Sequence, residues 1–130
     1  MKTLIAEDDT ICRAVLHHLL AAYGPCQATT NGREALTAVR QARQTSEPYD
    51  LICLDILMPE MDGQATLKAI RADEEALGIY SHRGVKIIMT TALDDAFNIM
   101  GAFYELCDGY LVKPIDLKRV KAMLEQLKLA

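Results

Sequence analysis

The 130-residue sequence predicts a single α/β domain built on a parallel sheet. Short apolar runs rich in β-branched residues alternate along the chain with stretches of helical periodicity. Strict alternation of this kind favours parallel strands joined by right-handed crossovers, with helices on both faces of the sheet. Some of the apolar runs are unbroken, as expected of strands that are covered on both faces.

Five segments are expected to be strands, and a helix is expected after each. The strands are predicted at residues 2–6, 26–30, 51–55, 85–91 and 109–114. In the first helix Ile11, Val15 and Leu19 recur at helical spacing, flanked by Cys12, Leu16 and Leu20, before the segment ends at "YGP". The second helix is expected to begin at Asn31, with Glu34 three residues later as in a capping box.

The remaining helices are predicted from charge and apolar spacing. The third helical region runs on through "RADEEALGIYSHRG" (71–84), and its charges are interpreted as a solvated face. The fourth lies within "DDAFNIMGAFYELCDGY" (94–110) and carries more than one apolar stripe. Asp116 is expected to cap the fifth helix, which has an apolar stripe made of Leu117, Val120, Met123, Leu124 and Leu127.

Composition excludes several classes of function. A formal charge of −4 and a pI near 5.3 leave no basic field for nucleic acid. No apolar stretch approaches about 18 residues, so no membrane contact and a cytoplasmic location are expected. Adjacent His17 and His18 point in different directions on a helix, which is poor geometry for a metal. Reduced, mostly buried thiols are expected for Cys12, Cys26, Cys53 and Cys107, which form no C-x-x-C pair.

Charged or hydroxyl residues that could share one site lie at the ends of the first, third, fourth and fifth predicted strands. They are Glu7 and Asp8, Asp55, Thr90 and Thr91, and Lys113. The carboxyl ends of parallel strands meet at one edge, where ligands bind. Two carboxylates about 4 Å apart repel by roughly 4 kcal/mol at an effective dielectric constant near 20. Mg²⁺ would relieve this repulsion, and Lys113 with a threonine hydroxyl could then hold phosphoryl oxygens. The plain alternative is a set of unrelated polar residues at a wet rim.

Taken together, "IAEDD", "LDILMPEMDG", "TTA" followed by Leu93, and "GYLVKP" resemble the motifs of the receiver domain of two-component response regulators. The resemblance is to the stand-alone, chemotaxis-regulator type and covers essentially the whole chain. It implies a flavodoxin-like (βα)5 fold with strand order 2-1-3-4-5, which is the known strand order of receiver domains. A single receiver domain over residues 1–130, without an output domain, is expected.

The resemblance also implies a role for each site residue. Asp55 would accept a phosphoryl group from a phosphohistidine on a sensor histidine kinase or histidine phosphotransfer protein. Mg²⁺ would be held by Glu7 through water, by Asp8 and Asp55, and by the backbone carbonyl of Leu57. Lys113 and Thr91 would contact the phosphoryl group, with Thr91 selected over Thr90 by its spacing to Ala92. Thr91 and Tyr110 would form the switch, and the Lys113–Pro114 bond would be cis.

The implied output is binding of an unidentified downstream protein, or relay of the phosphoryl group. The switching face would comprise the fourth helix, fifth strand and fifth helix, and the chain would be a monomer or weak homodimer through it. Extra apolar residues of the fourth helix are either part of such a surface or ordinary exposed side chains; they include Phe97, Met100, Phe103 and Tyr104. The chain would catalyse only its own phosphorylation and dephosphorylation.

Two leucines bear on the lifetime of the phosphoryl group. Leu57 and Leu93 each lie two positions after an implied site residue, where the resemblance places side chains that flank the hydrolytic water. Neither can orient a water, so slow self-dephosphorylation is expected. Alternatively, both leucines simply pack at the rim and the lifetime is set elsewhere.

Two other classes of protein compete with the receiver interpretation. A Mg²⁺-dependent phosphatase of the haloacid dehalogenase type also uses a strand-end Asp nucleophile, but its second Asp, the acid/base, would lie at position 57, which is Leu here. A flavodoxin-like mononucleotide binder would need a hydroxyl- and glycine-rich loop after the first strand. The segment "EDDTIC" offers carboxylates instead.

Overall fold

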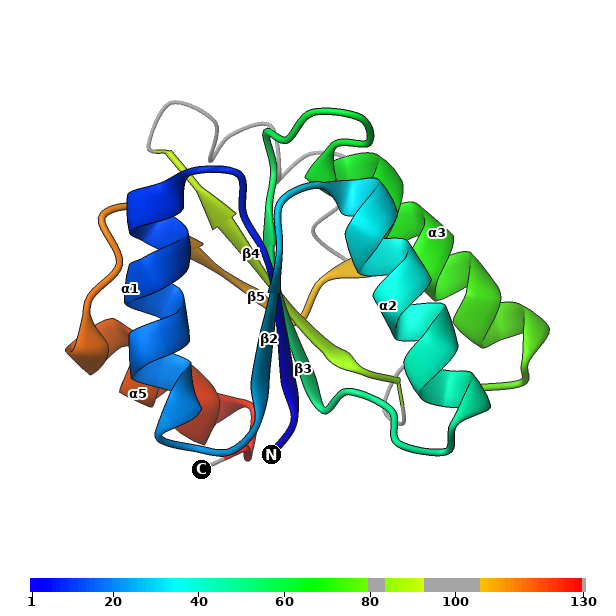
Figure 1. Cartoon of the computed structure of the whole chain (residues 1–130). Coiled ribbons are helices and arrows are strands. Elements are labelled where there is room, and N and C mark those ends of the chain that lie inside the picture. Colours follow the sequence, from blue (N-terminus) through cyan, green and yellow to red (C-terminus); the bar gives the residue numbers. More distant parts are fainter. Residues whose placement is uncertain (80–83, 93–105, 130) are drawn as a thin grey trace.

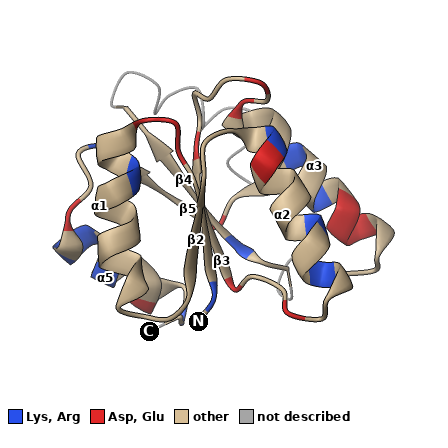
Figure 2. Ribbon diagram, viewed as in Figure 1, with Lys and Arg blue, Asp and Glu red and all other residues tan. Residues whose placement is uncertain are grey.

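The strands form one parallel sheet, seen in a computed structural model that describes residues 1–79, 84–92 and 106–129 (Figure 1). Its strand order is β2-β1-β3-β4-β5, which confirms the expected 2-1-3-4-5 arrangement. The strands are β1 (Thr3–Ala6), β2 (Cys26–Thr29), β3 (Leu51–Asp55), β4 (Lys86–Thr91) and β5 (Gly109–Val112). Charged residues lie on the helices, on the loops and at strand ends, whereas the middle of the sheet is uncharged (Figure 2).

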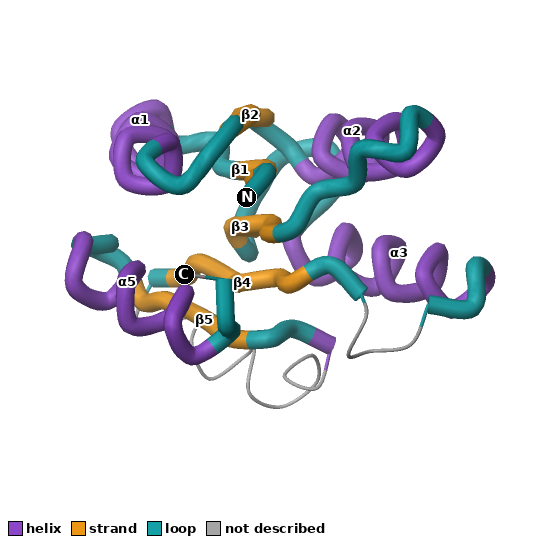
Figure 3. Tube along the Cα trace, turned by 90° about the horizontal axis from the view of Figure 1, so that it is seen from below, coloured by secondary structure: helices purple, strands orange, loops and turns teal. Residues whose placement is uncertain are grey.

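Helices cover both faces of this sheet. Those in the described part of the chain are α1 (Thr10–Ala21), α2 (Gly32–Gln44), α3 (Gly63–Ala76) and α5 (Leu117–Gln126). Figure 3 shows α1 and α5 on one face and α2 and α3 on the other. The helix expected within residues 94–110 falls largely on residues 93–105, outside the described residues.

Side-chain caps begin the helices where the sequence predicts them. The Asn31 side chain accepts a hydrogen bond from the Glu34 amide at 2.8 Å, and Asp116 accepts one from the Arg119 amide at 2.8 Å. The Glu34 carboxylate turns back to the amide of Thr30 at 3.0 Å, one residue before the cap. Each cap satisfies amide groups that the first turn of a helix leaves without a partner.

Two apolar cores lie on the two faces of the sheet. The α1/α5 core contains Leu16, Leu20, Val120 and Leu124 from the helices and Ile5, Leu51, Cys53, Ile88 and Leu111 from the strands. The α2/α3 core takes the alternate strand residues, among them Leu4, Ile52, Leu54, Ile87 and Met89. Successive residues of a strand point to opposite faces, so membership of one core identifies the face of each strand residue. This assignment also orients the residues that follow the strands.

Two expectations about burial are wrong, and the structure also identifies which stripe of α1 is buried. The buried face of α1 is Leu16 and Leu20, while Ile11 is 75% exposed, because the sheet contacts the flanking stripe. Within 71–84, Glu74 is only 3% exposed and belongs to a charged network rather than to a solvated face. All four cysteines are free as expected, but only Cys53 is buried.

No helix in the described ranges is both long and apolar enough to cross a membrane.

Candidate functional site

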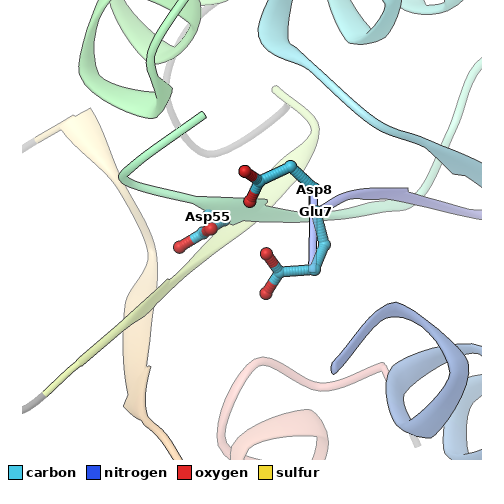
Figure 4. Close-up of side chains that lie close together, drawn as sticks. All are labelled: Glu7, Asp8 and Asp55. Atoms are coloured by element: carbon cyan, nitrogen blue, oxygen red, sulfur yellow. The ribbon is translucent and has the colours of Figure 1, made fainter. Parts of the chain in front are cut away.

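Three carboxylates meet at the carboxyl end of the sheet. Glu7 and Asp8 follow β1, and Asp55 ends β3. One carboxylate oxygen from each lies within 4.8 Å of the others, and Figure 4 shows the three side chains converging. Glu7 is 0% exposed and Asp55 is 5% exposed, whereas Asp8 faces solvent. The sequence prediction that these acids share one site is therefore confirmed as a matter of geometry.

The sheet itself brings the site residues to one face. Glu7, Asp55 and Lys113 each lie two positions beyond a strand residue of the α1/α5 core, namely Ile5, Cys53 and Leu111 respectively. Alternation along a strand therefore places all three side chains on the α1/α5 face. The site is a polar continuation of that core at the upper edge of the sheet in Figure 1.

Lys113 is the cation of the site. Its Nζ lies 2.7 Å from Oε1 of Glu7 and 3.4 Å from Oδ1 of Asp55. Since β4 and β3 separate β5 from β1, the lysine side chain crosses β4 to reach these acids. The Lys113–Pro114 peptide bond is cis, as expected. The ammonium group thus partly neutralises a cluster with an excess of negative charge.

Burial and neighbouring charge shift two pKa values here. The pKa of Asp55 is raised to about 7: burial is the main cause, a hydrogen bond and the charge of Glu7 act in the same direction, and Lys113 opposes them. Burial alone lowers the pKa of Lys113, but its hydrogen bond to Glu7 and the charges of Asp55 and Glu7 outweigh this, so the net shift is upward. A cation at this site favours the ionised Asp55 that a nucleophile needs.

Neighbouring residues keep the loop after β1 in shape. Asp9 accepts hydrogen bonds from the amides of Ile11 at 2.8 Å and Cys12 at 3.0 Å, so it caps α1. The Arg13 guanidinium donates to the backbone carbonyl of Glu7 at 2.9 Å. In the sequence "EDD", the first two acids thus belong to the site and the third to the helix.

Gly63 is a site-shaping residue that the sequence analysis did not single out. A Cβ at this position would lie 2.1 Å from the backbone oxygen of Asp55. Its amide donates to the carbonyl of Ile56 at 2.8 Å, so α3 begins directly against the end of β3. The available signal was the glycine that follows the capping Asp62.

The other predicted residues lie around the cluster in different environments. Thr91 is buried, and its hydroxyl donates to the carbonyl of Ala92 at 3.0 Å. Tyr110 is half-buried against the α2/α3 core. Leu57 is 62% exposed. Leu93, like the apolar residues predicted for a partner face (Phe97, Met100, Phe103 and Tyr104), lies outside the described residues.

Comparison with known proteins decides the family. The profile of the family described as "Response regulator receiver domain" matches residues 3–125. The chain belongs to this family. As a receiver, it is 35% identical over 127 residues to the regulatory protein VanRB of Enterococcus faecalis, covering 95% of this chain and 51% of VanRB. The chain thus spans about half the length of that curated relative, and a quarter of the Escherichia coli regulatory protein ZraR, with which it shares 33% identity.

Solved receiver structures share the fold. The chemotaxis protein CheY4 of Vibrio cholerae matches with a TM-score of 0.77 and 26% identity, over 97% of each chain. A chain in the co-crystal structure of the Saccharomyces cerevisiae phosphotransfer protein Ypd1 and the receiver domain of Ssk1 matches with a TM-score of 0.79 and 27% identity, over 96% of this chain and 87% of that one. Family membership selects the receiver interpretation over the phosphatase and mononucleotide-binding alternatives.

Proposed function

We propose that this receiver takes a phosphoryl group onto Asp55 from a phosphohistidine on a sensor histidine kinase or histidine phosphotransfer protein. The observation that carries the proposal is the position of Asp55, buried at a strand end between Lys113 and the acidic pair Glu7 and Asp8. The related Ssk1 receiver, crystallised with Ypd1, supports a donor of this class. The cytoplasm is the location that we propose for the exchange.

Mg²⁺ is the cofactor that the donor set fits. Carboxylate oxygens are the ligands that this hard cation takes, usually one or two of them together with water and phosphate oxygens. Asp8 and Asp55 would bind the ion directly, and Glu7 would bind it through water. The backbone carbonyl of Leu57 would be the remaining protein ligand. When bound, the ion neutralises charge on the transferring phosphoryl group.

The chain's own residues perform the transfer by position and charge. A carboxylate oxygen of Asp55 forms the new bond to phosphorus while the phosphorus–nitrogen bond of the donor breaks, and the electron pair stays on the imidazole. Lys113 and the hydroxyl of Thr91 then contact phosphoryl oxygens, since such reactions depend mainly on placement and electrostatics. The reaction modifies the chain itself, which makes it a signalling domain that catalyses only its own phosphorylation and dephosphorylation.

Phosphorylation is proposed to change the surface that binds a partner. Movement of Thr91 toward the phosphoryl group would let Tyr110 turn inward, altering the face of the fourth helix, β5 and α5. That face would bind a downstream protein or a second copy of the chain, or the phosphoryl group would pass to another histidine. Tyr110 packs against the α2/α3 core, so its position is sensitive to changes at the end of β4.

The test is labelling by acetyl phosphate followed by mass spectrometry and peptide mapping. One phosphoryl group should appear on Asp55 in Mg²⁺ and be absent in chelator. Asp55→Asn should abolish it. Asp50→Asn is the matched control, because Asp50 precedes the same strand at its other end and is exposed. Equal labelling of Asp55→Asn and Asp50→Asn, or labelling that proceeds in chelator, would contradict the proposal.

A further inference from the structure

Thr90 carries a buried hydroxyl that has no hydrogen-bond partner. The residue is 0% exposed, and its Oγ1 makes no hydrogen bond. Buried polar groups are nearly always paired, because an unpaired one has lost its hydrogen bonds to water. An unpaired hydroxyl next to a reactive carboxylate therefore suggests that the hydroxyl is used during the reaction.

The hydroxyl lies on the same face as the site. Thr90 is two positions beyond Ile88 of the α1/α5 core, as Asp55 is beyond Cys53. In the register between β3 and β4, Asp55 is paired directly with Thr90. Thr91 follows Met89 of the α2/α3 core, so alternation places its side chain on the other face of β4.

Strand spacing identifies Asp55 as the acceptor within reach. Neighbouring strands lie about 4.8 Å apart, so paired side chains on one face are in contact range. Glu7 follows β1, which is one strand further away. Lys113 crosses β4 on this face, and its Nζ is 3.4 Å from Oδ1 of Asp55. Asp55 therefore has an ammonium on one oxygen and an unused hydroxyl on the adjacent strand.

We propose that Thr90 is a positioning residue for the phosphoryl transfer. Its hydroxyl donates a hydrogen bond to the Asp55 carboxylate oxygen that Lys113 leaves when the amine turns to the incoming phosphoryl group. The donated bond fixes the carboxylate so that its other oxygen faces phosphorus. This inference rests on the proposed function and adds to it a residue that the sequence analysis passed over in favour of Thr91.

The chain offers a matched control for this role. Thr3 is also on the α1/α5 face, is 1% exposed, and has a hydroxyl without a partner, but it lies at the far end of β1. Thr→Val removes the hydroxyl with little change in shape. Thr90→Val and Thr3→Val should both melt at or above the parent's temperature in metal-free buffer, because each removes an unpaired buried group.

The experiment measures the rate of Asp55 phosphorylation by acetyl phosphate at saturating Mg²⁺. Thr90→Val should be about tenfold slower, the effect of one hydrogen bond to a charged group. Thr90→Ser, which keeps the hydroxyl, should be within about twofold of the parent, as should Thr3→Val. Thr90→Ala is a second variant without the hydroxyl and should be slow as well. The Mg²⁺ concentration that gives half of the thermal stabilisation should stay within about twofold in all variants.

Two results would overturn the inference: Thr90→Val reacting as fast as Thr3→Val, or Thr90→Ser being as slow as Thr90→Val. A parent protein that is not labelled on Asp55 at all would instead overturn the proposed function, and the inference with it.

Discussion

Two charged clusters lie at opposite ends of the same sheet, and they differ in how completely their charges are paired. The carboxyl-end cluster consists of Glu7, Asp8, Asp55 and Lys113. The amino-end network consists of Arg43, Arg71, Glu74, Lys86 and Asp108. The carboxyl-end cluster has one cation and three acids, whereas the amino-end network has three cations and two acids.

The amino-end network is densely hydrogen-bonded. Glu74 accepts from Arg71 at 2.6 Å, from the Val85 amide at 2.8 Å and from Arg43 at 3.3 Å. Asp108 accepts from Arg71 at 2.9 Å and from the Ile87 amide at 2.8 Å. Its two acids therefore each have a guanidinium and a backbone partner, and together they join α3 to the starts of β4 and β5.

The comparison separates structural charge from functional charge. Buried ions are tolerated where partners replace the lost water, and the two acids of the amino-end network, Glu74 and Asp108, meet that condition. The carboxyl-end cluster leaves an excess of acids, which an incoming cation would neutralise. It also leaves an unpaired Thr90 hydroxyl, which would donate to Asp55 once Lys113 turns to the phosphoryl group. The excess of acids over cations thus marks the end of the sheet where a ligand is expected.

The largest expected effect comes from breaking the amino-end network. Arg71→Met leaves Glu74 and Asp108 without their shared partner and should lower the free energy of unfolding in urea by about 3–5 kcal/mol. Arg40→Met is the control: it removes the exposed pair with Asp73 and should change stability little, because exposed pairs are screened by water. Equal stabilities for the two variants would mean that the network is not structural.

Next in size is the lifetime of phospho-Asp55. Leu57 is 62% exposed beside the carboxyl-end cluster and offers no group to position water. Leu57→Asn, alone or with Leu93→Glu, should speed decay in Mg²⁺ by up to about 10²-fold. Leu77→Asn is the control, since Leu77 is 63% exposed on a different surface. Decay in the parent as fast as in Leu57→Asn would show that the lifetime is set elsewhere.

A smaller effect should follow from metal binding. Mg²⁺ at ten times its dissociation constant should stabilise the parent by about 1.4 kcal/mol, and chelator should remove this gain. Asp8→Asn should weaken the response and raise metal-free stability, because one of the three repelling acids is gone. The measurement is melting temperature against Mg²⁺ concentration. A response that is the same in both proteins would exclude Asp8 from the metal site.

The smallest effect concerns pH at the exposed edge of the amino end. The hydrogen bond and charge of Arg40 lower the pKa of Asp73 below its usual value of 3.8. A lowered folded-state pKa adds stability above the unfolded-state pKa, and this stability is lost as the pH falls through the folded-state value. Asp73→Asn should therefore be slightly less stable than the parent near neutral pH and equal to it in strong acid. Urea titrations at both pH values measure the difference, and a gap that widens in acid would contradict it.

The sequence by itself determined the fold class, the strands and the three acids of the site. Those features depend on local patterns: apolar runs mark β1, β3 and β4, and a carboxylate directly after a buried run must lie at a strand end. The caps Asn31 and Asp116 were predictable for the same reason, because a cap contacts residues only three positions away. Lys113, which follows β5, was predicted as a site residue from the same local pattern.

Only the tertiary structure decided the contacts away from that strand-end site and the face that each side chain takes. Arg71 and Asp108 are 37 residues apart, and their pairing is part of a half-buried network around the buried Glu74 on a helix face that the sequence suggested was solvated. In α1, contact with the sheet selected Leu16 and Leu20 over an equally spaced stripe. Thr90 and Thr91 are neighbours with the same side chain, yet strand register and core packing put only Thr90 directly opposite Asp55. Such contacts depend on strand order and register, which are set by the packing of the whole chain and are not encoded at any single position.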